Sequence, residues 1–258
     1  MINRNQIIRR ADDDGVPAAT VERDYILSHV LAAIANCEEA EQIVFKGGTA
    51  LRLCYFEDYR YSADLDFSLI GELDRPGALR AVAKALAVCQ RALGLPALSL
   101  TDATPPRIEY TGPLGRSRGL KLDLADDELV ENTIRRPVFR RYSDQEECNC
   151  LAYTLEETAA EKLRCVIQRL QCRDLYDIHE LFVVRGLEES FVWPLFDRKA
   201  RHRRLDSSLF PARFEERLPQ YKARWTNELS DHVPGEPPQF ETILRAVRRA
   251  LRDSLRRH

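Results

Sequence analysis

The strongest structural signal in this chain is the segment FKGGTALRLCYFEDYRYSADLDFS, which runs from Phe45 to Ser68. The apolar residues Ile43, Val44 and Phe45 lie at or just before its start and are followed by Gly47 and Gly48. This pattern predicts a buried strand that enters a tight turn. A helix over residues 50–56 is expected to follow. The free N–H groups at its start, next to two residues without side chains, would let a phosphate approach the backbone closely.

The end of the segment, Asp64-Leu65-Asp66-Phe67, alternates acidic and apolar side chains. On a strand, this alternation places both carboxylates on one side and turns Leu65 and Phe67 into the core. Neighbouring carboxylates repel each other unless a cation lies between them, and a set of oxygen ligands suits Mg²⁺ or Mn²⁺. The alternative is a surface strand with incidental acids, but the glycine turn ahead of it favours a metal site.

The two ends of this segment resemble the nucleotidyltransferase superfamily typified by DNA polymerase β. They are more similar to its AbiEii-like branch, the nucleotidyltransferase toxins of type IV toxin–antitoxin systems, which includes the mycobacterial MenT toxins. The matching runs are Phe-Lys-Gly-Gly-Thr-Ala-Leu at residues 45–51 and Arg-Tyr-Ser-Ala-Asp-Leu-Asp-Phe at residues 60–67. Thr49 stands where the superfamily has serine, and the spacer before Asp64 is long. The resemblance covers the chain from Val21 to Leu187.

Charge is balanced over the whole chain but not along it. The 258 residues carry 39 Lys and Arg against 41 Asp and Glu, a net charge of −2. Residues 195–258 hold 15 of these cations and 9 of the acids, which leaves 24 and 32 in the first 194 residues. An acidic front and a basic tail fit a metal site joined to a surface that binds a polyanion.

The sequence has no apolar run of membrane-spanning length and no apolar signal core near Met1, so we expect a soluble, cytoplasmic protein without a membrane partner. Its seven cysteines are expected to be reduced and mostly buried. Cys148-Asn149-Cys150 lacks a Cys-x-x-Cys pair and a nearby histidine, so we do not expect structural zinc.

A third carboxylate arises from a predicted β-hairpin, with strands over residues 107–110 and 120–124 around a glycine-rich basic tip. Because Leu120, Leu122 and Leu124 share one face of the second strand, Asp123 lies on the other. Asp123 is then either a third metal ligand beside Asp64 and Asp66 or an exposed acid on an edge strand. The resemblance favours the ligand, because superfamily members take a third ligand from a later strand of the same sheet.

From Thr154 onward the pattern becomes helical, and Thr154 with Glu157 predicts a capping box. Lys162 and Arg169 share a helix face that differs from the apolar one. A row of helical cations is usually a solvated face. The resemblance implies a functional role, because AbiEii-like proteins have a lysine in this helix and an Arg-Asp-Leu-Tyr-Asp segment after it, which places Asp177 in the site.

Other helices are predicted over residues 21–36 and 75–93, and a basic amphipathic helix over residues 240–257. The last helix combines an apolar stripe with six arginines: Arg245, Arg248, Arg249, Arg252, Arg256 and Arg257. These arginines either bind phosphates or form a charged outer face, and the sequence leaves both possibilities open.

Together these patterns predict an α/β (α+β) fold. Residues 1–150 would form a nucleotidyltransferase-type catalytic domain, a mixed sheet flanked by helices, and residues 151–258 a mostly helical C-terminal region. The expected reaction moves an NMP from an NTP to an acceptor hydroxyl. Its catalytic residues would be Asp64, Asp66, Lys162 and Asp177. The nucleotide would bind Gly48, Thr49, Lys162 and Arg169, and Mg²⁺ (or Mn²⁺) would bind Asp64, Asp66 and Asp123.

The resemblance implies the 3′ end of tRNA as the acceptor, a block of translation, a cognate antitoxin as partner, and Ser62 or Thr49 as a point of inhibitory phosphorylation. Three alternatives remain: transfer to a small molecule, transfer to a protein side chain, or a non-catalytic nucleotide-binding or scaffold relative. The basic tail argues against a compact acceptor, and the intact Asp64, Asp66 and Lys162 argue against loss of catalysis. No motif reveals which base the nucleotide carries.

Overall fold

The computed structural model describes residues 1–101 and 103–256, and it confirms the predicted mixed α/β class. The chain forms two compact units. The first contains Met1–Glu128, Thr133–Ala152 and Asp231–Gly235, and the second contains Leu129–Asn132, Tyr153–Ser230 and Glu236–His258. The division into domains at residue 150 stays a prediction.

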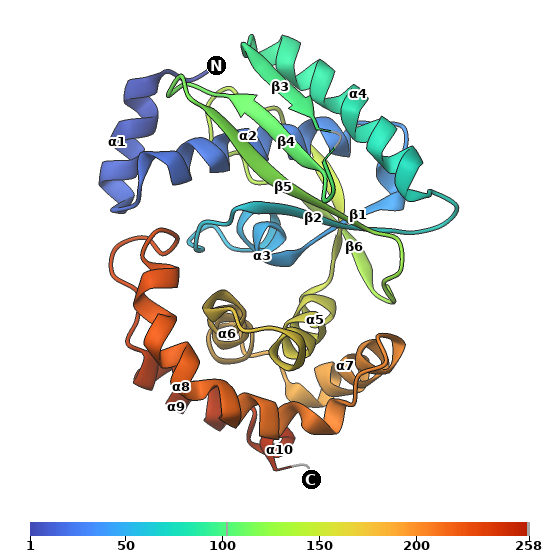
Figure 1. Cartoon of the computed structure of the whole chain (residues 1–258), viewed down its shortest axis with the longest axis vertical. Helices are drawn as coiled ribbons and strands as arrows, with labels where there is room; N and C mark the ends of the chain where they lie inside the picture. The colour runs from blue at the N-terminus through green and yellow to red at the C-terminus, as the bar shows by residue number, and fades with distance from the viewer. Residues whose placement is uncertain (102, 257–258) are drawn as a thin grey trace. The chain divides into compact units, whose positions relative to one another are not determined.

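A seven-stranded sheet has the order β3-β4-β5-β2-β1-β7-β6 in the described chain (Figure 1). The strands are β1 Ile43–Lys46, β2 Asp64–Leu69, β3 Ala97–Leu100, β4 Arg107–Thr111, β5 Ser117–Ala125, β6 Thr133–Pro137 and β7 Asn149–Tyr153. β4 and β5 form the predicted antiparallel hairpin, and β5 then pairs in parallel with β2. β1 lies antiparallel to β2 and parallel to β7. The glycine turn and the acidic strand are therefore direct neighbours.

The helices of the first unit are α1 Arg4–Asp14, α2 Ala18–Ala35, the 3-10 turn η1 Ala40–Gln42, α3 Gly47–Ala50, the π-helical turn η2 Leu51–Tyr55, and α4 Arg75–Leu93. α4 has the predicted bounds because Asp74 accepts a hydrogen bond from the Gly77 N–H at its start and Gly94 ends it at φ 62°. In Figure 1, α4 runs along β3.

The helix predicted over residues 50–56 starts earlier than expected. Gly47 already belongs to α3, because its φ of 80° reverses the chain within a single residue and leaves no separate turn. The second half, from Leu51, winds as a π-helix rather than an α-helix.

The second unit contains α5 Leu155–Gln168, α6 Cys172–His179, the π-helical turn η3 Glu180–Val184, α7 Glu189–His202, η4 Ser207–Leu209, α8 Phe210–Leu229, α9 Phe240–Ala250 and α10 Arg252–Leu255. The helix predicted over residues 240–257 is thus two helices, since the chain leaves helical geometry at Leu251 (φ −103°, ψ 29°). Arg257 lies outside the described residues.

Only half of the predicted capping box forms at α5. The Thr154 hydroxyl accepts a hydrogen bond from the Glu157 N–H, as expected. The buried Glu157 carboxylate instead accepts from the N–H groups of Glu131 and Asn132 and pairs with Lys199 at 2.6 Å. A buried carboxylate gains more from an ammonium and two amides than from a return contact to Thr154.

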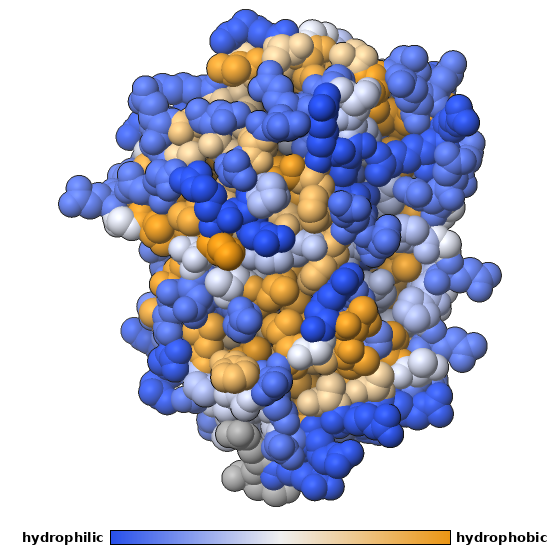
Figure 2. Space-filling view, turned by 180° about the vertical axis from the view of Figure 1, so that it is seen from behind, coloured by the Kyte–Doolittle hydropathy of each residue, from blue (hydrophilic) through white to orange (hydrophobic). Residues whose placement is uncertain are grey.

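Within the described residues, no helix is both long and apolar enough to cross a bilayer. Hydrophilic side chains form most of the outline of the face seen in Figure 2, with hydrophobic residues between them. Among the large apolar side chains of the described residues, Phe191 is the most exposed, at 71%. All seven cysteines are free, and all except the half-buried Cys37 are buried.

Candidate functional site

The glycine turn at the end of β1 packs closely against the side chains of Asp66 and Arg60. A Cβ on Gly47 would lie 2.6 Å from Oδ2 of Asp66, and a Cβ on Gly48 would overlap with Nη2 of Arg60. Contacts this short do not occur with real side chains, and Gly47 also needs its positive φ. Gly47 therefore requires glycine, whereas a side chain at Gly48 would displace the Arg60 guanidinium. The turn lies directly beside the Asp66 carboxylate.

The predicted acidic face is present on β2 and β5. Asp66 and Asp123 are partners in the parallel register, and Asp64 is opposite Lys121. Because residues in register on neighbouring strands point to the same side, the three carboxylates share one face of the sheet. They are half-buried, while the intervening Leu65 and Leu122 are fully buried.

Burial raises the pKa of Asp66 to about 6, with the Asp64 carboxylate as the second cause and Lys46 acting against both. A carboxylate whose charged form is disfavoured by its surroundings is the kind of group that a bound cation stabilises. The oxygen donors of Asp64 and Asp66 therefore fit a hard divalent ion. Across residues 1–101 and 103–256, however, no three His, Cys, Asp or Glu side chains are positioned to hold a metal together. The third ligand, Asp123, stays a prediction.

Two buried cations near this face have no role in the sequence-based prediction. Lys46 is in register with Asp66 across the antiparallel pair β1–β2, and its Nζ lies 3.7 Å from a Glu128 carboxylate oxygen. The Arg60 guanidinium lies against Gly48 and donates to the Tyr61 carbonyl at 3.1 Å. Their positions in the sequence could have indicated a role. Lys46 directly precedes the two glycines, and Arg60 begins the run that contains Asp64 and Asp66.

The Thr49 hydroxyl has a structural partner in this fold. It donates a hydrogen bond to the Asp64 carbonyl at 2.5 Å, which ties the helix after the turn to the start of β2. Thr49 and Ser62 are both buried, so phosphorylation of either hydroxyl requires local opening of the first unit.

In the second unit, Lys162 of α5 lies between two aspartates of α6. Its Nζ is 2.9 Å from Oδ1 of Asp174 and 2.7 Å from Oδ2 of Asp177. Arg169, at the end of α5, donates two further hydrogen bonds to Asp174 at 2.9 and 3.1 Å. Burial alone would raise the pKa of Asp174, but Lys162 and Arg169 outweigh it and hold that pKa below its ordinary value. The structure thus brings together Lys162, Arg169 and Asp177, and adds Asp174 as the residue that links them.

The basic helix α9 is anchored by its apolar side. Ile243, Leu244, Val247 and the following Leu251 are buried. The arginines at positions 245, 248, 249, 252 and 256 are exposed, and Arg248 pairs with Glu215 of α8 at 2.6 Å. The helix therefore docks on the second unit and still presents a row of cations to solvent.

Comparisons with known proteins support this fold. The family model described as "Nucleotidyl transferase AbiEii toxin, Type IV TA system" matches residues 29–249. No curated protein sequence matches the chain. Among solved structures, MenT4, a nucleotidyltransferase toxin of Mycobacterium tuberculosis, is similar with a TM-score of 0.59 at 20% identity, over 76% of this chain and 69% of that one.

A crystal structure of a putative nucleotidyltransferase from H. pylori is also similar, with a TM-score of 0.55 at 14% identity, over 93% of this chain and 96% of the other. At these identities the two structures support the fold. The family match covers most of the chain, and the acidic strand beside the glycine turn lies inside it. The chain belongs to the AbiEii nucleotidyltransferase toxin family of type IV toxin–antitoxin systems.

Proposed function

We propose that this nucleotidyltransferase moves an NMP from an NTP to a hydroxyl at the 3′ end of tRNA and thereby blocks translation. The observation that carries the proposal is the pair Asp64 and Asp66 on β2, with Asp66 packed against Gly47 of the turn. A carboxylate pair beside a helix start offers a cation site and N–H donors in one place, which is what a triphosphate requires.

The metal in this proposal is Mg²⁺, or Mn²⁺ in its place, held by Asp64 and Asp66 with Asp123 assisting. When bound, it lowers the pKa of the acceptor hydroxyl and offsets charge on the departing pyrophosphate. Lys46, in register with Asp66, limits the repulsion within the acidic group.

The backbone N–H groups at the start of α3 bind terminal phosphates, since no side chain of the described residues caps this helix end. Gly48 contributes its backbone N–H, and the Arg60 guanidinium occupies the space beside it. The Thr49 hydroxyl donates its hydrogen bond to the Asp64 carbonyl, so its main contribution is to hold β2 in place. It can donate to a phosphate only after rotating.

Lys162 neutralises the charge that builds on the triphosphate during in-line attack, and Arg169 assists it. Asp174 and Asp177 fix the Lys162 ammonium from two sides, so that little reorganisation is needed when the charge develops. Asp177 in this account is a positioning residue that acts through Lys162.

The RNA acceptor is proposed from the exposed arginines of α9 and from membership of this toxin family. In a toxin–antitoxin system the toxin is neutralised by a cognate antitoxin. Addition of a nucleotide to the tRNA end that carries the amino acid would stop charging. The same family relation makes an antitoxin the expected protein partner.

The deciding experiment incubates the protein with each NTP labelled at the α-phosphate, Mg²⁺ and total RNA, and resolves RNA and protein on one gel. Label in a tRNA band is expected, and label should be absent with Asp64→Ala or Asp66→Ala. Label only in a protein band would replace the RNA acceptor with a side chain. No labelled product with any NTP, with RNA or with added small-molecule alcohols, would contradict catalysis by this chain.

A further inference from the structure

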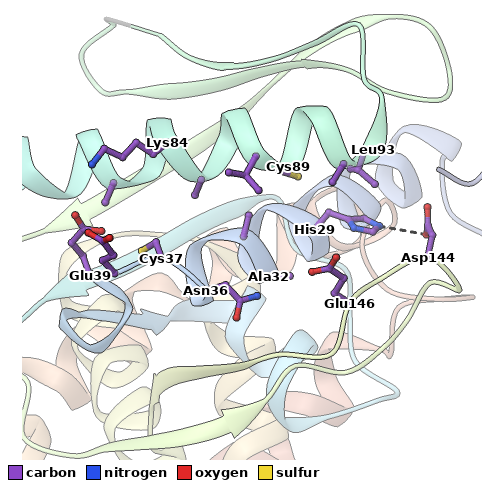
Figure 3. A pocket seen from close by; sticks show the side chains of 16 residues that line it. His29, Ala32, Asn36, Cys37, Glu39, Lys84, Cys89, Leu93, Asp144 and Glu146 are labelled. Carbon is purple, nitrogen blue, oxygen red and sulfur yellow. Dashed lines mark ion pairs between the residues drawn. The ribbon is translucent and has the colours of Figure 1, made fainter.

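A cavity of the first unit lies between α2 and α4 (Figure 3). Its volume is about 410 Å³, within the range of sites that hold small organic ligands. The lining comes from α2 and the residues after it, from α4, and from residues 144 and 146. None of the lining residues belongs to the acidic face on β2 and β5.

The middle of this cavity is apolar because the two helices face each other with small side chains. The apolar lining includes Ala32, Ala33, Ala81, Ala85, Val88, Cys89 and Ala92, and Leu93 lies toward the end that holds His29 (Figure 3). Along α4, the lining positions recur at spacings of three and four residues, which is the repeat of one helix face. This alanine-rich part of the cavity is the apolar channel.

Each end of the channel carries carboxylates. Figure 3 shows Glu39 and Lys84 at one end, where Glu38 also contributes to the lining, and Asp144 with Glu146 at the other. Lys84 contributes one positive charge to the lining at the first end, against the two acids. At the second end the Met1 amino group lies 3.2 Å from Oδ2 of Asp144 and offsets its charge. One negative charge therefore remains at each end.

A polar pair lies at the second end, formed by the buried His29 and the half-buried Asp144. His29 is only 7% exposed, and its Nε2 makes no hydrogen bond within the described chain, although it lies 3.5 Å from Oδ1 of Asp144, which makes none either. Burial holds the pKa of His29 below its ordinary value, so the ring is neutral near pH 7. Buried polar atoms normally have a hydrogen-bond partner, and a ligand N–H placed here would provide one for the carboxylate.

We propose that this cavity binds a linear aliphatic polyamine. Its methylene chain would occupy the alanine-lined middle, and its terminal ammonium groups would lie against Glu38 and Glu39 at one end and Asp144 and Glu146 at the other. The pattern of acid, apolar channel and acid matches a molecule that is cationic at both ends and apolar between them. A simple metal ion or a monoamine satisfies only part of it.

The test is isothermal titration calorimetry of the whole protein with three probes: spermidine, 1,6-diaminohexane and 1-aminohexane. The two probes with several charges should bind at least about fivefold more tightly than the monoamine, because they gain a second ion pair. Equal affinities for 1,6-diaminohexane and 1-aminohexane would overturn the proposal, since they would show that the second acidic end contributes nothing.

Variants then locate the binding. Glu146→Gln and Glu39→Gln should each weaken 1,6-diaminohexane binding by roughly two- to fivefold. The matched control is Glu147→Gln, which removes a neighbouring exposed acid that is not part of the lining. Ala33→Leu should fill the channel and abolish binding while the melting temperature shows that the protein is folded.

The acidic face on β2 and β5 also attracts cations, so Asp66→Asn supplies the last control. Binding of 1,6-diaminohexane should survive Asp66→Asn and disappear in Ala33→Leu. The reverse pattern would place the amine on the acidic face and refute a site between α2 and α4. This outcome is independent of nucleotidyl transfer, because the readout is heat of binding without NTP or RNA.

Discussion

Gly47 has a special backbone conformation and also contacts a proposed metal ligand, Asp66. It combines a φ of 80° with an Asp66 carboxylate that occupies the space of a Cβ. Gly94, at the end of α4, has a similar φ of 62°, but a Cβ there would have no heavy atom of the described residues within 4 Å. The two glycines therefore differ in the crowding around them and share a left-handed backbone conformation that other residues rarely adopt.

Gly47→Ala and Gly94→Ala should both lose roughly 1–3 kcal/mol of stability from the left-handed backbone. Only Gly47→Ala should also displace the Asp66 carboxylate and lower nucleotidyl transfer by about 10²-fold, the order expected for misplaced reacting groups. Thermal unfolding and the labelled-NTP assay on both variants check this. Equal transfer activities for the two would show that the Asp66 position is not critical.

Lys162 has a structural role in addition to the proposed catalytic one. Lys162→Ala removes the ammonium between two buried carboxylates, so we expect a stability loss of about 3–5 kcal/mol together with a drop in turnover on the order of 10²- to 10³-fold. The double variant Lys162→Met with Asp177→Asn removes one buried charge of each sign. It should regain part of the stability and none of the turnover.

Activity that returns along with stability in that double variant would leave Lys162 as a structural partner only. Arg169→Ala provides the comparison, because Arg169 is half exposed and Asp174 keeps its ion pair with Lys162. It should lower turnover moderately and change the melting temperature little.

At the scale of elements, α9 has separate apolar and cationic faces that can be changed independently. Leu251→Ala should cost about 2–5 kcal/mol, because Leu251 is fully buried. Changing Arg245, Arg249 and Arg252 to Gln should leave stability nearly unchanged and weaken RNA binding, with a salt slope reduced by about 0.7–0.9 for each phosphate that no longer pairs with an arginine. RNA titrations at several salt concentrations measure this. An unchanged slope would make the arginines a solvated face.

The elements near the glycine turn could be predicted because their signals are local. The alternation of Asp64 to Phe67 is enough to place Asp64 and Asp66 on one face, and that of Leu120 to Leu124 places Asp123 opposite the leucines. The structure adds the register that aligns Asp66 with Asp123 on the same face. The bounds of α4 could be predicted from Pro76 near its start and Gly94 at its end, and the structure adds the Asp74 cap.

Other features depend on partners distant in the sequence, which no local pattern contains. Lys46 is buried at the end of β1 with the Glu128 carboxylate near its ammonium group. Glu157 does not complete the capping box because it pairs with Lys199 of α7. The shared role of Asp174 likewise needs α5 and α6 in place. The proposed catalytic roles also stay predictions, because they depend on how the nucleotide, the metal and the acceptor bind.

At the scale of the whole molecule, the acid stability of the protein should depend on a buried pair behind the glycine turn. Asp24 of α2 accepts hydrogen bonds from Nε of Arg52 at 2.5 Å and from the Tyr142 hydroxyl at 2.8 Å. Arg52 also donates to the Tyr59 carbonyl, so the pair joins α2, η2 and the loop before β2. Burial would raise the pKa of Asp24, but Arg52 outweighs it, and the pKa lies below its ordinary value.

A carboxylate with a lowered pKa in the folded state stabilises the protein fully above its unfolded pKa of about 4 and loses this contribution as the pH falls through the folded value. Asp24→Asn should therefore cost about 3–5 kcal/mol at pH 7, where it leaves Arg52 buried without its carboxylate. The gap to the wild type should narrow below pH 4, because the wild type then protonates Asp24 as well. Denaturant unfolding across this pH range measures both, with the exposed Asp13→Asn as a control that should follow the wild type. A gap that stays constant into strong acid would mean that packing, rather than the charge of Asp24, holds these segments together.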